Sequence, residues 1–167
     1  RVRYWDKAGT EGGAGARSAG PLMSRTRAGL YYVEDVVKGR WSSGAREVII
    51  KQTCQTDNLR YNGRVVTWSE QEPGSGGKES AENTVRNLAG YEVHTDRVTG
   101  DKVTRARPFA AQAEAGNVYL VDGEWNAEFL AEVCSFPTGK LKDQVDGCSG
   151  AFNKLAQVVT VEDNYDF

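Results

Sequence analysis

A chain of 167 residues is long enough to form one domain with its own hydrophobic core, and 39% hydrophobic with 26% charged residues is typical of a globular protein. No apolar run could span a bilayer, and the net charge of −2 excludes a generic basic nucleic-acid-binding protein. Three widely spaced cysteines, Cys54, Cys134 and Cys148, indicate neither a zinc site nor a disulfide framework. We therefore expect a soluble domain from a reducing compartment, with the cysteines as small core residues.

The first part of the sequence has the pattern of a short β-meander. Residues 2–6 predict a strand that ends on Asp6, and a glycine-rich stretch from Gly9 to Gly20 predicts a flexible loop. Leu, Tyr and Val residues at 21–26 and 29–37 predict two further strands of an antiparallel unit. Asp6 therefore becomes an isolated acid at the end of the first strand.

The pattern then changes to alternating helices and strands. We expect a helix at 44–55, a turn at 61–64 and a mostly apolar strand at 64–70 that ends on Glu70. Glu72, two residues further on, is the alternative to Glu70, but Pro73 and Gly74 make it part of the following loop. This unit places a second isolated acid at a strand end.

The remaining elements complete an α/β pattern. They are a helix at 78–89, a strand at 91–95, a helix at 102–114 interrupted near Pro108, a strand or hairpin at 117–123 and a helix at 124–134. This order predicts a mixed sheet of about five main strands, the first three antiparallel, with helices on both faces and an extra β-hairpin.

Residues 140–147, Lys-Leu-Lys-Asp-Gln-Val-Asp-Gly, have the pattern of a helix start. Asp143 and Asp146 would stand one turn apart on one face, while Val145, Ser149, Phe152 and Ala156 would turn a separate stripe toward a core. Acids in a first helical turn also complement the helix dipole without any metal. The two interpretations differ in whether other acids meet this face.

Asp6, Glu70, Asp143 and Asp146 together offer hard oxygen ligands from ordered elements, which suit Mg²⁺ or Mn²⁺. Clustered carboxylates repel one another, so a fold keeps them together when a cation or protonation offsets the cost. One or two such ions would support phosphodiester hydrolysis. These acids are therefore the candidate metal-ligating and catalytic residues.

Other motifs give weaker signals. The loop 74–80 resembles a phosphate-binding loop but has Glu72 and Glu79 where a Walker A motif needs Gly and Ser or Thr. His94, the only histidine, has no nucleophile and acid at a recognisable spacing. Basic residues are the candidates for phosphate contacts, without a base-reading element: Lys78, Arg97, Lys102, Arg105, Arg107 and Lys142.

The sequence resembles the C-terminal nuclease domain of the large terminase subunit of tailed bacteriophages. Four stretches carry the resemblance in order across nearly the whole chain: Tyr-Trp-Asp-Lys-Ala at 4–8, Ser-Glu-Gln-Glu-Pro-Gly-Ser-Gly-Gly-Lys at 69–78, Arg-Pro-Phe at 107–109 through Gly-Asn-Val at 116–118 to Trp125, and Phe-Pro at 136–137 through Asp-Gln-Val-Asp at 143–146. Each stretch is weak alone, and together they are specific.

The resemblance implies an RNase H-like fold with a two-metal site. Asp6, Glu70 and Asp143 match its three acids, and Asp146 matches a fourth ligand or a residue behind the ligands. The family's commoner motif, His-Asp-Asp, two residues and Asp, here has Leu141 and Lys142 at its first two positions. Loss of one carboxylate and gain of a cation puts tight binding of a second metal in question.

The resemblance also implies a function and partners. We expect a nuclease domain at 1–160, an acidic tail at 161–167, and an N-terminal ATPase domain outside this sequence. The function expected is metal-dependent cutting of concatemeric viral DNA during genome packaging, with little sequence preference, in the host cell cytoplasm. Double-stranded DNA, the ATPase domain, the small terminase subunit and the portal protein are the expected partners of a monomeric domain. The alternatives are a junction resolvase, a ribonuclease, or a non-catalytic DNA-holding module.

Overall fold

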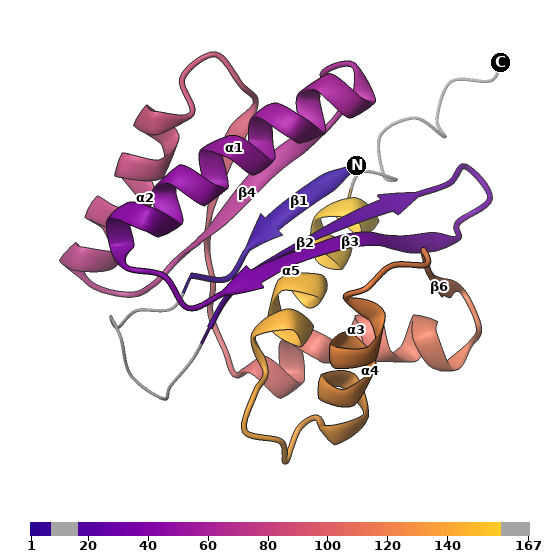
Figure 1. The fold of residues 1–167 in the computed structure, drawn as a ribbon. Helices are drawn as coiled ribbons and strands as arrows, with labels where there is room; N and C mark the ends of the chain where they lie inside the picture. Colours follow the sequence, from indigo (N-terminus) through magenta and orange to yellow (C-terminus); the bar gives the residue numbers. More distant parts are fainter. Residues whose placement is uncertain (8–16, 158–167) are drawn as a thin grey trace, which may run out of the picture.

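The strands form one six-stranded mixed sheet in the order β5-β4-β1-β2-β3-β6 (Figure 1). A computed structural model describes residues 1–7 and 17–157 of the chain. β1 to β3 are antiparallel, β4 and β5 run parallel to β1, and β6 runs parallel to β3. The strands are β1 (Val2–Trp5), β2 (Ser18–Arg25), β3 (Tyr31–Gly39), β4 (Val66–Gln71), β5 (Val93–Arg97) and β6 (Val118–Leu120).

Helices cover both faces of this sheet. α1 (Ser43–Tyr61) and α2 (Ser75–Asn87) lie on one face. α3 (Lys102–Glu114), α4 (Asn126–Ser135) and α5 (Asp143–Gln157) lie on the other (Figure 1). The predicted mixed sheet, with its first three strands antiparallel and helices on both faces, is therefore confirmed. None of the described helices has a stretch both long and apolar enough to cross a membrane.

The predicted glycine-rich loop was wrong in its C-terminal limit. β2 already begins at Ser18, inside the stretch predicted as a flexible loop, because it pairs along its length with β3. Gly20 is required there since a Cβ would collide with the indole of Trp5. Residues 9–16 of that stretch and the predicted tail at 161–167 lie outside the described residues. The segment 117–123, predicted as a strand or hairpin, contains one edge strand, β6, paired with β3.

Two helices are longer or more continuous than predicted. α1 extends to Tyr61 and ends where Asn62 adopts a left-handed conformation, with its N–H bonded to the carbonyl of Asn58. α3 continues through Pro108, because Ala106 and Phe109 on either side of it are anchored in the core. Tertiary burial thus outweighs the local helix-breaking preference of proline here.

Alternation along β1 sends successive side chains to the two sides of the sheet. Val2 and Tyr4 enter the core beneath α5, whereas Trp5 packs with Ile50, Cys54 and Leu88 beneath α1 and α2. Continuation of this alternation places Asp6 on the α5 side and Lys7 on the α1 and α2 side. The first strand therefore delivers an acid to one face and a lysine to the other.

A buried ion pair ties β1 to α1. The Arg3 guanidinium, 2% exposed, donates two hydrogen bonds of 2.8 Å to Asp57 on α1. It also donates to Asp35 at 2.8 Å and to the Gly20 carbonyl at 2.7 Å. Burial opposes the charge, but the two carboxylates outweigh it and raise the pKa of Arg3. This arginine holds together β1, β2, β3 and the helix that covers them.

α5 is the most deeply buried helix, and small residues let it approach the sheet. A Cβ at Gly147 would collide with the Pro21 ring, and one at Gly150 would collide with the Tyr4 ring. Its buried residues include Val145, Ser149 and Phe152, as predicted, but Ala156 is exposed because Leu155, one residue earlier, is the side chain of the last turn that enters the core.

The cysteines are free among the described residues. Cys54 and Cys148 are buried in the two cores, and burial raises the pKa of both thiols. Cys134 is exposed on α4, so the expectation that all three are core residues was wrong for Cys134, whose helix buries Phe129 and Glu132 instead.

Candidate metal centre

The strand register brings Asp6 and Glu70 together. β1 and β4 are parallel, with Tyr4 opposite Trp68 and Trp5 opposite Ser69, so Asp6 and Glu70 follow at the same level. Parallel strands end at the same edge of a sheet, where ligands of α/β proteins commonly bind. Both carboxylates also lie on the α5 side because they are two residues beyond Tyr4 and Trp68.

α5 supplies the third carboxylate. One oxygen each from Asp6, Glu70 and Asp146 lie within 4.8 Å of one another, and all three side chains are at least nine-tenths buried. In the described part of the chain, these three residues are the group whose side chains lie close enough together to bind a metal ion. Close contact of Gly147 with the sheet explains how the neighbouring Asp146 reaches the strand ends.

Asp143 is buried one turn before Asp146 but lies outside this group. Its Oδ2 accepts a hydrogen bond of 3.0 Å from the Arg17 backbone N–H, and the Arg17 Nε lies 4.0 Å away. Glu72, the alternative to Glu70, is exposed in the loop after β4. Of the acids named from the sequence, the structure thus brings together Asp6, Glu70 and Asp146.

Two cations from α3 contact the three carboxylates. Lys102 Nζ donates to Asp6 Oδ2 at 3.1 Å and lies 2.8 Å from Asp146 Oδ2. Arg105 Nη2 contacts both oxygens of Asp146 at 2.7 and 2.6 Å, and its Nη1 lies 3.4 Å from Glu70 Oε1. Both residues were predicted to bind phosphate, whereas here they partly neutralise the acids.

The electrostatics reflect this crowding. Burial raises the pKa of Asp6 to about 8, with Asp146 and Glu70 raising it further in opposition to Lys102. Burial and Asp146 likewise raise the pKa of Glu70. Burial disfavours the charge on Lys102, but Asp6 and Asp146 outweigh it, so the pKa of Lys102 is raised. The centre therefore has a marked preference for positive charge.

The donors present fit a hard divalent cation. Asp6, Glu70 and Asp146 provide only carboxylate oxygens, the ligands that Mg²⁺ and Mn²⁺ prefer. Glu70 Oε2 is buried and has no hydrogen-bond donor among the described residues. A buried carboxylate oxygen without a donor is costly unless a cation satisfies it. These three residues would hold the first ion.

Residues behind the ligands fix the start of α5, and the sequence pattern did not reveal them. Glu132 of α4, 4% exposed, accepts hydrogen bonds of 2.7 Å from both the backbone N–H and the side-chain amide of Gln144. Arg17 donates to the same carboxylate at 2.6 Å. The sequence did contain one signal for Glu132: it lies next to Val133 and one turn after Phe129, and is therefore an acid on the predicted inner face of α4.

A fourth carboxylate lies beside Glu70 and is already neutralised. Asp96 on β5 pairs with Glu70 in the parallel register. It accepts hydrogen bonds from Tyr4 Oη at 2.8 Å and from Lys154 Nζ at 2.7 Å. Lys154 also lies 4.3 Å from the centre of the Trp68 ring, against which His94 stacks. His94 thus packs against Trp68, and its Nε2 lies 3.4 Å from Glu92 Oε1, away from the three-carboxylate group.

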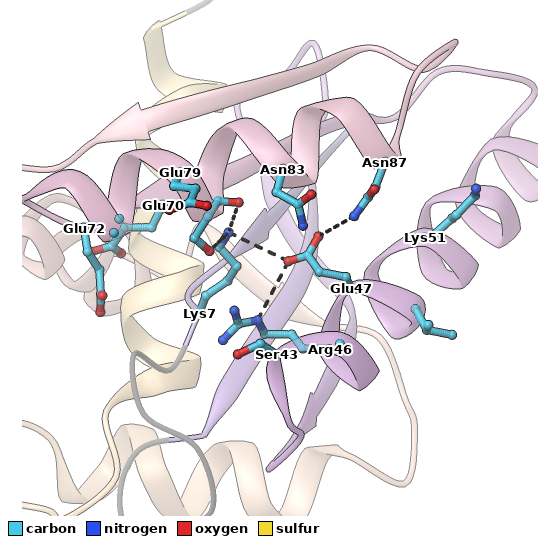
Figure 2. A pocket seen from close by; sticks show the side chains of 15 residues that line it. Lys7, Ser43, Arg46, Glu47, Lys51, Glu70, Glu72, Glu79, Asn83 and Asn87 are labelled. Carbon is cyan, nitrogen blue, oxygen red and sulfur yellow. Dashed lines mark hydrogen bonds and ion pairs between the residues drawn. The ribbon is translucent and has the colours of Figure 1, made fainter.

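Lys7 marks a polar cleft of about 960 Å³ on the α1 and α2 side (Figure 2). Its ammonium donates to the Ser80 hydroxyl at 2.9 Å and to the Thr84 hydroxyl at 3.0 Å, and burial lowers the pKa of Lys7 to about 8. Figure 2 shows Glu72 toward one end of the cleft and Lys51 toward the other. Lys7 thereby anchors the strand end that carries Asp6 to α2.

The other predicted DNA-binding residues are distributed over the surface. Lys78 at the start of α2 is exposed and lies 3.6 Å from Glu82. Arg97 at the end of β5 and Arg107 on α3 are exposed, and Lys142 just before α5 is half-buried. These four residues could contact a polyanion directly. Lys102 and Arg105 could not do so while they contact the carboxylates.

Comparisons with known proteins identify the fold and the family. The structure is similar to that of the yeast mitochondrial Holliday junction resolvase Ydc2, with a TM-score of 0.54 and 10% sequence identity, over 95% of this chain and 81% of the resolvase chain. At this identity the likeness shows the fold alone. A comparison with curated protein sequences gives no match. Residues 3–155 match the family model described as Terminase RNaseH-like domain, and the chain therefore belongs to this family, with an RNase H-like fold.

Proposed function

We propose that the domain is a metal-dependent endonuclease that cuts concatemeric viral DNA during genome packaging. The observation that supports this most directly is the group formed by Asp6, Glu70 and Asp146 at the strand ends of a terminase-family fold. Packaging partners follow from the family: double-stranded DNA, an ATPase domain, a small terminase subunit and a portal protein. The proposed location is the cytoplasm of the host cell.

In the proposed reaction the ion and the protein have different roles. A divalent cation on these oxygens would polarise a phosphodiester and supply an activated water. Asp6 and Glu70 would hold the ion from the sheet, and Asp146 would hold it from a packed helix. Arg105 offsets the repulsion among the carboxylates. Asp143 would reach a second ion only on release from Arg17, so we expect it to contribute less to the reaction than these three acids.

Cleavage of supercoiled plasmid tests the proposal. We expect the domain to convert it to nicked and linear forms with Mn²⁺, and to lose this activity in EDTA because the carboxylates alone supply no Lewis acid. Asp6→Asn, purified in the same way, should abolish cleavage and thereby exclude a contaminating nuclease. Lys51→Gln in the α1 and α2 cleft should keep the parent rate, which shows that the loss is specific to the acid. Equal cleavage by Asp6→Asn and the unmodified domain would reject this assignment.

A junction resolvase is the second candidate, supported by the shared fold with the mitochondrial enzyme. Competition among linear duplex, four-way junction and RNA–DNA hybrid separates these functions. Preferential cleavage of the four-way junction at equal substrate concentrations would indicate a resolvase. Preferential cleavage of the RNA–DNA hybrid would indicate a ribonuclease. A purely DNA-holding module would show no saturable Mn²⁺ site by calorimetry.

Metal binding should depend on pH through Asp6. Because the pKa of its carboxyl is raised to about 8 in the metal-free protein, a cation must displace a proton below that pH. We expect Mg²⁺ affinity to rise about tenfold per pH unit from pH 6 to 8 and then to level off. Titration calorimetry in buffers of different ionisation enthalpy measures both the affinity and the proton released. A constant affinity over this range would show that Asp6 is already ionised at pH 6.

A further inference from the structure

Lys102 occupies the same oxygens that a metal would use. Its ammonium lies 3.1 Å from Asp6 Oδ2 and 2.8 Å from Asp146 Oδ2, two of the three carboxylates in the candidate centre. An ammonium and a divalent cation cannot both occupy this position, because each needs the lone pairs of these oxygens and the two charges repel. Binding of the ion therefore requires Lys102 to leave.

The position of Lys102 on α3 permits such a movement. It is the first residue of the helix, and Asp101 before it caps the helix by accepting from the Thr104 N–H at 2.9 Å. The backbone is thus held while the four-carbon side chain, 39% exposed, can turn outward. Arg105 is only 16% exposed and contacts Asp146 and Glu70 Oε1, but it leaves Glu70 Oε2 without a donor and does not contact Asp6. It can therefore remain beside a bound ion, whereas Lys102 cannot.

We propose that Lys102 exchanges between two partners: the carboxylates in the metal-free protein, and a phosphate of the nucleic-acid substrate once a cation has replaced it. The inference rests on the proposed nuclease function. The metal brings a phosphate to the same strand ends from which the ammonium has been displaced, so the released charge remains within reach of a new anion. Lys102 thereby couples metal binding to substrate binding as a substrate-binding residue.

The exchange predicts opposite effects of one substitution. Lys102→Gln removes the competing ammonium, so affinity for Ca²⁺ measured by calorimetry without DNA should rise about tenfold. The same variant loses a phosphate contact, so affinity for a 20-base-pair fluorescent duplex at saturating Ca²⁺ should fall about threefold to tenfold. Lys102→Arg should recover duplex binding, because a guanidinium also binds phosphate.

Arg107→Gln is the matched control on the same helix: it should weaken duplex binding and leave Ca²⁺ affinity unchanged. If Lys102 were merely structural, Lys102→Gln would bind both Ca²⁺ and the duplex more weakly, which would overturn the proposal. Unchanged affinity of Lys102→Gln for Ca²⁺, or for the duplex, would also overturn it. Lys102→Met serves as second variant if Lys102→Gln fails to give the circular dichroism spectrum of the parent domain. Absence of Ca²⁺ and Mn²⁺ binding in the unmodified domain would instead refute the proposed function itself.

Discussion

Asp146→Asn is expected to lower the rate of plasmid cleavage by about 10³-fold, and Asp143→Asn by about tenfold or less. Asp146 has an oxygen within 4.8 Å of those of Asp6 and Glu70, whereas Asp143 accepts a hydrogen bond from Arg17 outside that group. Loss of one charged group that stabilises a reacting centre commonly removes this much rate. Single-turnover cleavage at saturating Mn²⁺ measures both variants.

Glu72→Gln is the matched control for Glu70→Gln, because both acids belong to the same strand end but Glu72 is exposed. Glu70→Gln should resemble Asp146→Asn, and Glu72→Gln should cut at nearly the parent rate. If Asp143→Asn is as impaired as Asp146→Asn, Asp143 leaves Arg17 in the active state and becomes a ligand, as the family resemblance implies.

Arg3→Met is expected to lower the free energy of unfolding by about 3–5 kcal/mol, the usual cost of leaving a buried acid without its partner. Arg3 is 2% exposed and Asp57 is 5% exposed, so solvent cannot replace the missing guanidinium. Urea denaturation followed by circular dichroism, with and without the substitution, gives the difference.

The pair between Arg1 and Glu34 provides the control, since it has a similar distance, 3.0 Å, but Arg1 is 36% exposed. Arg1→Met should cost about 0–1 kcal/mol. The double variant Arg3→Met with Asp57→Leu should recover much of the lost stability, because it removes the unpaired acid. A loss below about 1 kcal/mol in Arg3→Met would mean that this buried ion pair contributes little net stability.

Sequence reasoning located the strand-end acids because their signal is local. An apolar strand followed directly by one acid predicts a carboxylate at a sheet edge, and this pattern identified Asp6 and Glu70 as the acids the structure places together. The fold class also followed from the order of elements and was confirmed by the six-stranded sheet.

The orientation of α5 and α3 could not be predicted in this way. Asp143 and Asp146 share a helix face in the sequence pattern, and only the contact of Gly147 with Pro21 and of Gly150 with Tyr4 decides which acid meets the sheet. Similarly, the pairing of Lys102 with the acids depends on how α3 packs against α5, a contact between distant segments. Helix periodicity specifies a face, while tertiary packing specifies its partner.

The close fit of α5 against β1 also determines when the three-carboxylate group can be completed during synthesis. Asp6 and Glu70 can lie side by side as soon as β4 has paired with β1, but Asp146 is synthesised only after most of the described chain. An incomplete chain still on the ribosome therefore has no three-carboxylate group. If the proposed function is correct, a chain still in synthesis could not yet hold the ion with all three carboxylates.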